Sequence, residues 1–134
     1  TPLGLLKGLA TIRSGEYRDT IDMKLNGVVP VVDLGRMYAL QGRLAEVNTR
    51  ARLDAAIAAG IVSKSGGRDL LDAYVLVAQT RLDHQAALVN EGSAPDNFLP
   101  PATLSPFERS HLRDAFVVIK TMQSALMQGR GMLG

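Results

Sequence analysis

The 134-residue sequence contains no cysteine and no tryptophan. Without thiols the chain can form neither disulfides nor thiolate zinc sites, and it has no cysteine nucleophile. Such a composition suits a reducing compartment, so we expect a cytoplasmic location. Aromatic residues make up only 4% of the chain, which leaves the aliphatic residues Ala, Leu and Val to provide most of the core packing.

Long apolar runs and basic clusters are also missing. No continuous apolar segment is long enough to span a bilayer and no signal peptide is visible, so we expect no membrane association. No block of basic residues alternates with aromatic residues, which argues against a nucleic-acid partner. The net charge is only +2, but 11 arginines against 4 lysines favour forked donors that suit carboxylate or phosphate groups.

Acidic pairs of the kind that hold catalytic magnesium ions are absent as well. Nucleotidyl and phosphoryl transfer need carboxylates for Mg²⁺, usually with two of them at i and i+2 on a strand. None of the 13 acidic residues has another acidic residue two positions away. His84 and His111 belong to different predicted helices, so we expect no metal site. We therefore expect no catalytic residues, and this chain alone is not predicted to be an enzyme.

The strongest helical pattern in the sequence covers residues 68–90. Its apolar residues recur at about 100° per residue and define the expected core face: Leu70, Leu71, Tyr74, Val75, Ala78, Leu82, Leu88 and Val89. Arg81 and Gln85 project within this face, and His84 lies at its border. Because burying such groups unpaired costs about 1–3 kcal/mol each, they need partners. Two roles remain open for them: an internal hydrogen-bond network, or a pocket for an anionic ligand or a partner domain.

Three more helices are expected, at residues 30–41, 50–59 and 106–128. Ser105 and Glu108 form a capping box at the start of the last one, and Gly129 is expected to end it. Asn48 or Thr49 is the expected N-cap of the helix at 50–59.

The remaining segments are expected to be shorter or irregular. They are a weak helix at 3–12, a short extended segment at 14–27 closed by a turn at its last two residues, a linker at 63–67 and a crossing loop at 91–104. The sequence therefore predicts an all-α fold, with a single domain over residues 1–134. It is a helical bundle of two long and two or more shorter helices with an irregular N-terminal segment.

Several sequence blocks resemble those of one known family, in the same order along the chain. The blocks are Asp22-x-Lys24, Gly27, Pro30-x-Val32-Asp33-Leu34-x-Arg36, Asn48-Thr49-x-x-Arg52-Leu53, Arg81-Leu82-Asp83-His84-Gln85, Pro95-Asp96-Asn97 and Leu104-Ser105-Pro106-x-Glu108-Arg109. Together they are similar to the family called "putative nucleotidyltransferase substrate-binding domain". The resemblance covers nearly the whole chain, from about residue 3 to residue 128.

The resemblance implies a helical domain at the C-terminal end of a bacterial signal-transduction protein. Upstream it implies CBS or cyclic-nucleotide-binding regulatory domains and a nucleotidyltransferase domain in the same polypeptide. Catalysis, with Mg²⁺ and a nucleoside triphosphate, would belong to that upstream domain. The sequence begins at Thr1 without an initiator Met, so we expect it to be part of such a longer protein.

Two hypotheses about function follow from these patterns. The first is a non-catalytic accessory domain that helps a nucleotidyltransferase domain bind its substrate. Its candidate binding residues are Asp22, Lys24, Asp33, Arg36, Asn48, Arg52, Arg81, His84 and Gln85. The second is a structural module that docks the catalytic domain, or forms a homodimer, without contacting substrate. A concave pocket with polar groups would favour the first, and an exposed apolar patch the second.

Overall fold

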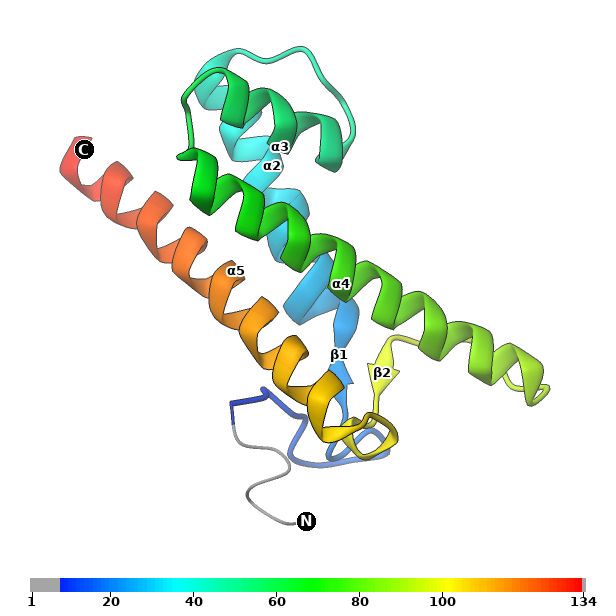
Figure 1. The fold of residues 1–134 in the computed structure, drawn as a ribbon. Helices are drawn as coiled ribbons and strands as arrows, with labels where there is room; N and C mark the ends of the chain where they lie inside the picture. The colour runs from blue at the N-terminus through cyan, green and yellow to red at the C-terminus, as the bar shows by residue number, and fades with distance from the viewer. Residues whose placement is uncertain (1–7, 134) are drawn as a thin grey trace.

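The computed structural model describes residues 8–133, with side chains up to residue 129, and most of this range is helical (Figure 1). Four α-helices are present: α2 (Val29–Gly42), α3 (Thr49–Ala58), α4 (Lys64–Asn90) and α5 (Pro106–Leu133). The long helices α4 and α5 run in opposite directions and make the most extensive contact between elements. The predicted all-α fold is therefore confirmed. Within residues 8–133, no helix combines the length and the apolarity that a membrane span requires.

The core lies where α2, α4 and α5 converge, and aliphatic side chains fill most of it. Its fully buried members come from every helix: Val31, Leu53, Leu70, Val77, Leu112 and Ile119. At Gly27, a Cβ atom would lie 2.4 Å from Val77 Cγ1, so only glycine permits this approach to α4.

The core face of α4 is rotated from the predicted one. Leu70, Ala73 and Val77 are buried, whereas Val75, Leu82 and Val89 are 46%, 55% and 56% exposed. The predicted stripe was too broad because it joined two apolar faces of one helix, and only one of them packs against α5, α3 and the turn that precedes α2. Arg81 and Gln85 are half-buried at the edge of the true core face, as expected for polar groups that need partners.

The predicted linker at 63–67 is wrong, because α4 already begins at Lys64. The hydroxyl of Ser63 accepts a hydrogen bond from Gly66 N at 3.0 Å, so Ser63 is the N-cap. Gly67 then lies in the first turn, where a Cβ atom would meet Ile57 Cγ1 at 2.4 Å. Gly66 and Gly67 thus allow the capped first turn of α4 to pack closely against α3.

The N-terminal segment differs from its prediction in three ways. The described part of the expected weak helix, residues 8–12, is not helical. The extended segment is reduced to β1 (Ile21–Asp22), and a π-helical turn, η1 (Lys24–Val28), replaces the expected Asn26-Gly27 turn and leads directly into α2. As a result, Ile21 and Met23 are buried but Leu25 is exposed, so these three side chains do not share one face.

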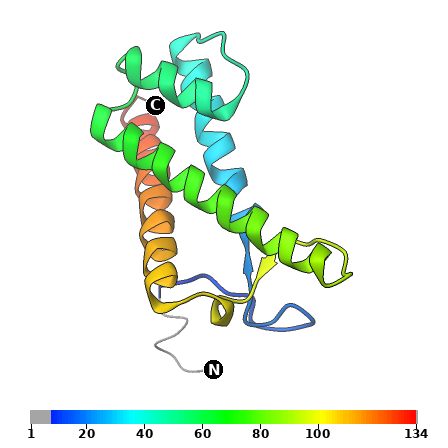
Figure 2. The same ribbon diagram turned by 45° about the vertical axis from the view of Figure 1, so that its right-hand side comes forward.

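The crossing loop contains the partner of β1. Strand β2 (Phe98–Leu99) pairs with β1 in antiparallel register, with Ile21 opposite Leu99, and a 3₁₀ turn, η2 (Pro101–Thr103), follows. α4 and α5 diverge toward the C-terminal end of α4, and the β1–β2 pair and η2 lie between them there (Figure 2). The pair thus joins the segment before α2 to the loop after α4.

The start of α5 is as predicted, but its end is not. Ser105 Oγ accepts a hydrogen bond from Glu108 N at 3.1 Å, and the Glu108 carboxylate accepts one from Ser105 N at 2.8 Å. This reciprocal pair is the expected capping box. Gly129 does not end the helix, which continues to Leu133, because a glycine without a left-handed conformation only weakens a helix.

Candidate functional site

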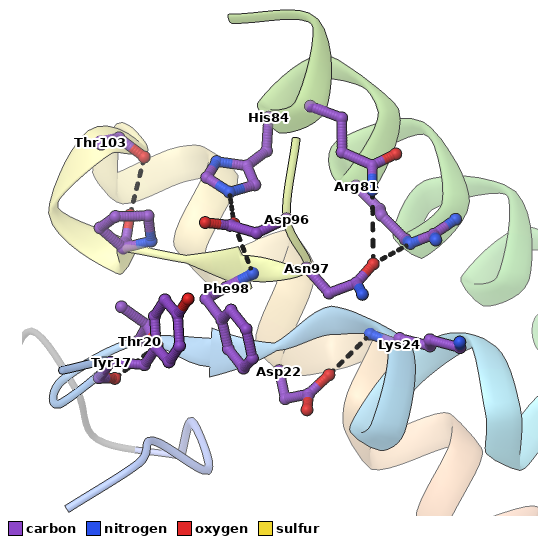
Figure 3. Close-up of polar contacts among 12 residues, drawn as sticks. Tyr17, Thr20, Asp22, Lys24, Arg81, His84, Asp96, Asn97, Phe98 and Thr103 are labelled. Carbon is purple, nitrogen blue, oxygen red and sulfur yellow. Dashed lines mark hydrogen bonds and ion pairs between the residues drawn. The ribbon is translucent and has the colours of Figure 1, made fainter. Parts of the chain in front are cut away.

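Polar side chains converge where the C-terminal half of α4 meets β2, and we call this cluster the polar corner (Figure 3). Its members are Asp22, Lys24, Arg81, His84, Gln85, Asp96 and Asn97. The side-chain oxygen of Asn97 accepts a hydrogen bond from Arg81 Nε at 2.7 Å and a longer one from Gln85 Nε2 at 3.4 Å. One amide oxygen therefore holds both polar groups that the sequence places within the apolar face of α4.

The backbone joins the corner to the β1–η1 junction. Met23 N donates to the Asn97 carbonyl oxygen at 2.8 Å. Just before it, Asp22 Oδ1 accepts hydrogen bonds from Lys24 N at 3.1 Å and Leu25 N at 2.9 Å. Asp22 thus caps the π-helical turn, and this turn carries the Lys24 side chain. Such wide turns are rare and are often found at functional sites.

His84 and Asp96 form a partly buried pair in the corner. His84 Nε2 lies 2.7 Å from Asp96 Oδ1, and their side chains are 10% and 32% exposed. A carboxylate can only accept, so Nε2 is the protonated ring nitrogen and donates. The same carboxylate oxygen accepts a bond from Phe98 N at 3.0 Å, which fixes the loop at the start of β2.

The Arg81 guanidinium keeps its outer nitrogens free of protein partners within the described part of the chain. Only Nε is bonded, and no partly or fully buried side-chain nitrogen or oxygen is both sealed from solvent and unpaired. The two Nη groups therefore reach solvent. Lys24 is exposed, and in Figure 3 its ammonium group and the Arg81 guanidinium both point away from the His84–Asp96 pair. Two cations with unused donors thus belong to the same corner.

The other four predicted site residues lie on α2 or at the start of α3 and make local bonds. Asp33 and Arg36 form an exposed ion pair one turn apart, at 4.0 Å. Asn48 Oδ1 accepts from Ala51 N at 2.8 Å, so Asn48 is the N-cap of α3. Arg52 Nε donates to the Glu46 carbonyl oxygen at 2.9 Å. Among residues 8–133 no hydrogen bond or ion pair joins these side chains to the polar corner.

Asp96 and Asn97 were not among the predicted site residues, although they hold the corner together. The available signal was their place in the block Pro95-Asp96-Asn97, inside an otherwise irregular loop. Their partners on α4 precede them by 12 to 16 positions, a spacing that no helix or strand period indicates. In the described part of the chain, no group of three or more His, Cys, Asp or Glu side chains could hold a metal ion.

Comparison with known proteins gives one match. The sequence profile of a family described as "Putative nucleotidyltransferase substrate binding domain" matches residues 1–129. No curated protein and no solved structure matches the chain. The matched range includes every residue of the polar corner.

Proposed function

The chain belongs to the family of putative nucleotidyltransferase substrate-binding domains, and we propose that it is an accessory domain whose polar corner holds an anionic group of the substrate. The observation that carries this proposal is the geometry of Arg81. Its Nε is fixed on Asn97 while its two Nη groups reach solvent. A guanidinium held in this way offers a planar pair of donors that matches the two oxygens of a phosphate or carboxylate.

The corner supplies the other features that an anion site needs. Lys24 adds a second positive charge without a protein partner in the described chain. The two acidic members are already occupied, since Asp22 accepts two backbone N–H groups and Asp96 accepts from His84 and Phe98. The two bonds of Asp22 fix the turn that carries the Lys24 side chain. Gln85 and Asn97 provide neutral donors beside Arg81.

Catalysis is part of a second domain in this proposal. A nucleotidyltransferase domain of the same polypeptide would hold Mg²⁺ and a nucleoside triphosphate. The accessory domain would fix the acceptor substrate or the nucleotide beside it. CBS or cyclic-nucleotide-binding domains would regulate the pair, in a bacterial signal-transduction protein of the cytoplasm. The family description supports the accessory role, and the missing acidic pair in this chain agrees with catalysis elsewhere.

An anion titration of the 134-residue chain tests the corner directly. We would follow the Arg81 Nε–H and Asn97 amide signals by NMR while adding a nucleoside triphosphate, a nucleoside monophosphate or inorganic phosphate. We expect both signals to shift, and Arg81→Lys to weaken binding at least about tenfold, because the charge remains but the fork is lost. Arg50→Lys is the matched control, since Arg50 is an exposed arginine on α3.

Two outcomes would contradict the proposal. One is no binding of any of these anions at millimolar concentration. The other is an equal loss of affinity in the Arg81 and Arg50 variants, which would indicate unspecific attraction to positive charge.

A second candidate function is supported by the outer face of α4. Val75, Leu82 and Val89 are exposed at seven-residue intervals, which is the spacing of an apolar seam between helices. This face could dock the catalytic domain or a second copy of the chain. Light scattering after size-exclusion chromatography, with Leu82→Glu as the disrupting variant, would detect the dimer. A monomeric chain at high concentration would leave only the docking role.

A further inference from the structure

A groove separate from the Arg81 side of the corner lies between α4 and the start of α5. Its volume is about 590 Å³, and between the two helices it is lined by Leu99, Pro100, Thr103 and Leu104. The apolar lining comes mainly from Leu76, Leu88, Leu99, Leu104 and Phe107. Phe107 is 70% exposed, although it is a large aromatic residue. An exposed aromatic side chain beside an apolar groove is typical of a binding surface.

The charges that line the groove have one sign. Its ionisable residues are Asp83, Glu91 and Glu108 together with two histidines, and no lysine or arginine is among the described lining residues. This contrasts with a chain whose overall charge is +2. The hydrogen bond from Ser105 N lowers the pKa of Glu108, so its carboxylate is ionised at neutral pH. The groove therefore has the opposite charge to the Arg81 side of the corner.

The two surfaces lie on opposite flanks of α4. Arg81 and Gln85 project from one flank toward Asn97, whereas Gln79 and Asp83 project from the other into the groove. His84 is between them, since it bonds Asp96 and also lines the groove. An anionic ligand suits the first flank only.

The length of the groove favours an elongated occupant. The apolar part of its lining on α4 runs from Leu76 to Leu88, which is about 18 Å at 1.5 Å per residue. This distance equals about three turns of a bound helix, and a helix that lays an apolar face into such a groove contacts it at i, i+3, i+4 and i+7. A compact organic cation would fill only part of this length.

We propose that this groove binds a basic amphipathic helix of a partner protein. The apolar face of the partner helix packs on the leucines and on Phe107. Its lysine or arginine side chains pair with Asp83, Glu91 and Glu108 along the rim. Charge complementarity selects basic segments over acidic ones, and Phe107 can add a cation–π contact. This inference does not depend on anion binding at Arg81.

A peptide titration tests the proposal on the 134-residue chain. The probe is a fluorescent 15-residue helical peptide with leucines on one face and arginines on both flanks, and its counterpart carries glutamates in place of the arginines. We expect the arginine peptide to bind at least about tenfold more tightly, as measured by fluorescence anisotropy, and to shift NMR signals of the groove residues. Binding should weaken as the salt concentration rises.

Matched variants separate the groove from general attraction to acidic side chains. Asp83→Asn combined with Glu91→Gln should lower the affinity at least about fivefold, whereas Asp33→Asn combined with Asp54→Asn removes the same charge elsewhere and should not. Phe107→Ala should weaken binding, and Met127→Ala, an exposed apolar residue farther along α5, should leave it unchanged.

Four results would overturn the proposal. They are no binding of the arginine peptide at millimolar concentration, equal binding of both peptides, equal losses in the groove and control variants, and binding of free arginine amide as tight as that of the peptide. The last result would assign the groove to a small organic cation.

Discussion

Arg81 shows how one bond can hold a charged side chain in place without burying its charge. Its partner is the neutral amide oxygen of Asn97 and not a carboxylate. Removal of the guanidinium therefore leaves no buried charge without a partner. Asn97 also keeps its bond from Gln85.

We predict that Arg81→Ala lowers the free energy of unfolding by only about 1 kcal/mol, the usual effect of losing one hydrogen bond. Loss of one partner from a buried ion pair would instead cost about 3–5 kcal/mol. Urea denaturation measures the difference, and the anion titration should show lost binding in the same variant. A loss near 3 kcal/mol would show that Arg81 is chiefly a structural residue.

The capping box of α5 gives a prediction at the level of one helix. Ser105 N–H and then the Ser105 hydroxyl lower the pKa of Glu108, because both hydrogen bonds favour its charged form. A carboxyl group with a lowered pKa stabilises the fold above its ordinary pKa, and this contribution is lost as the pH falls through the lowered value. Chemical denaturation between pH 6 and about pH 3 should therefore show a smaller loss of stability in Glu108→Gln than in the unchanged chain. Equal losses would mean that the Glu108 charge does not stabilise α5.

The two apolar faces of α4 can be distinguished by shortening one residue on each. Leu70 is fully buried, whereas Val75 is nearly half exposed. We expect Leu70→Ala to cost about 2–5 kcal/mol because it leaves a cavity, and Val75→Ala to cost less than about 1 kcal/mol. Thermal unfolding measures both. Similar costs would place Val75 in the core, as the apolar pattern alone had suggested.

Local signals in the sequence predicted the helices because their causes are local. Asn48 and the Ser105–Glu108 box act within one helical turn, so both caps are readable from residue types alone. The start of α4 was missed because two glycines indicate a linker unless the close approach of Ile57 is known. Residue types also could not show which apolar face of α4 meets α5, since that depends on tertiary packing.

Across the whole molecule, the all-α class and the need of Arg81, His84 and Gln85 for hydrogen-bond partners could be predicted, but the partners themselves could not. Asn97 and Asp96 come from a loop whose position depends on its pairing with β1. Such contacts join segments far apart in the chain, and no periodic pattern encodes them. The sequence blocks shared with the family included both residues without indicating their contacts.

The pairing of β1 with β2 also has a consequence for the order in which the molecule folds. It closes a loop that contains α2, α3 and α4, whereas each helix forms from near neighbours, so we expect the pair to form late and to open first. Native-state hydrogen exchange should then show the Met23 and Phe98 amides exchanging faster than the amides of Leu70 and Val77. Equal protection would place the pair in the same cooperative unit as the helices. A variant with a weaker β1–β2 pairing could lose the polar corner and still give the circular dichroism of a helical protein. Helicity alone would therefore not report an intact binding site.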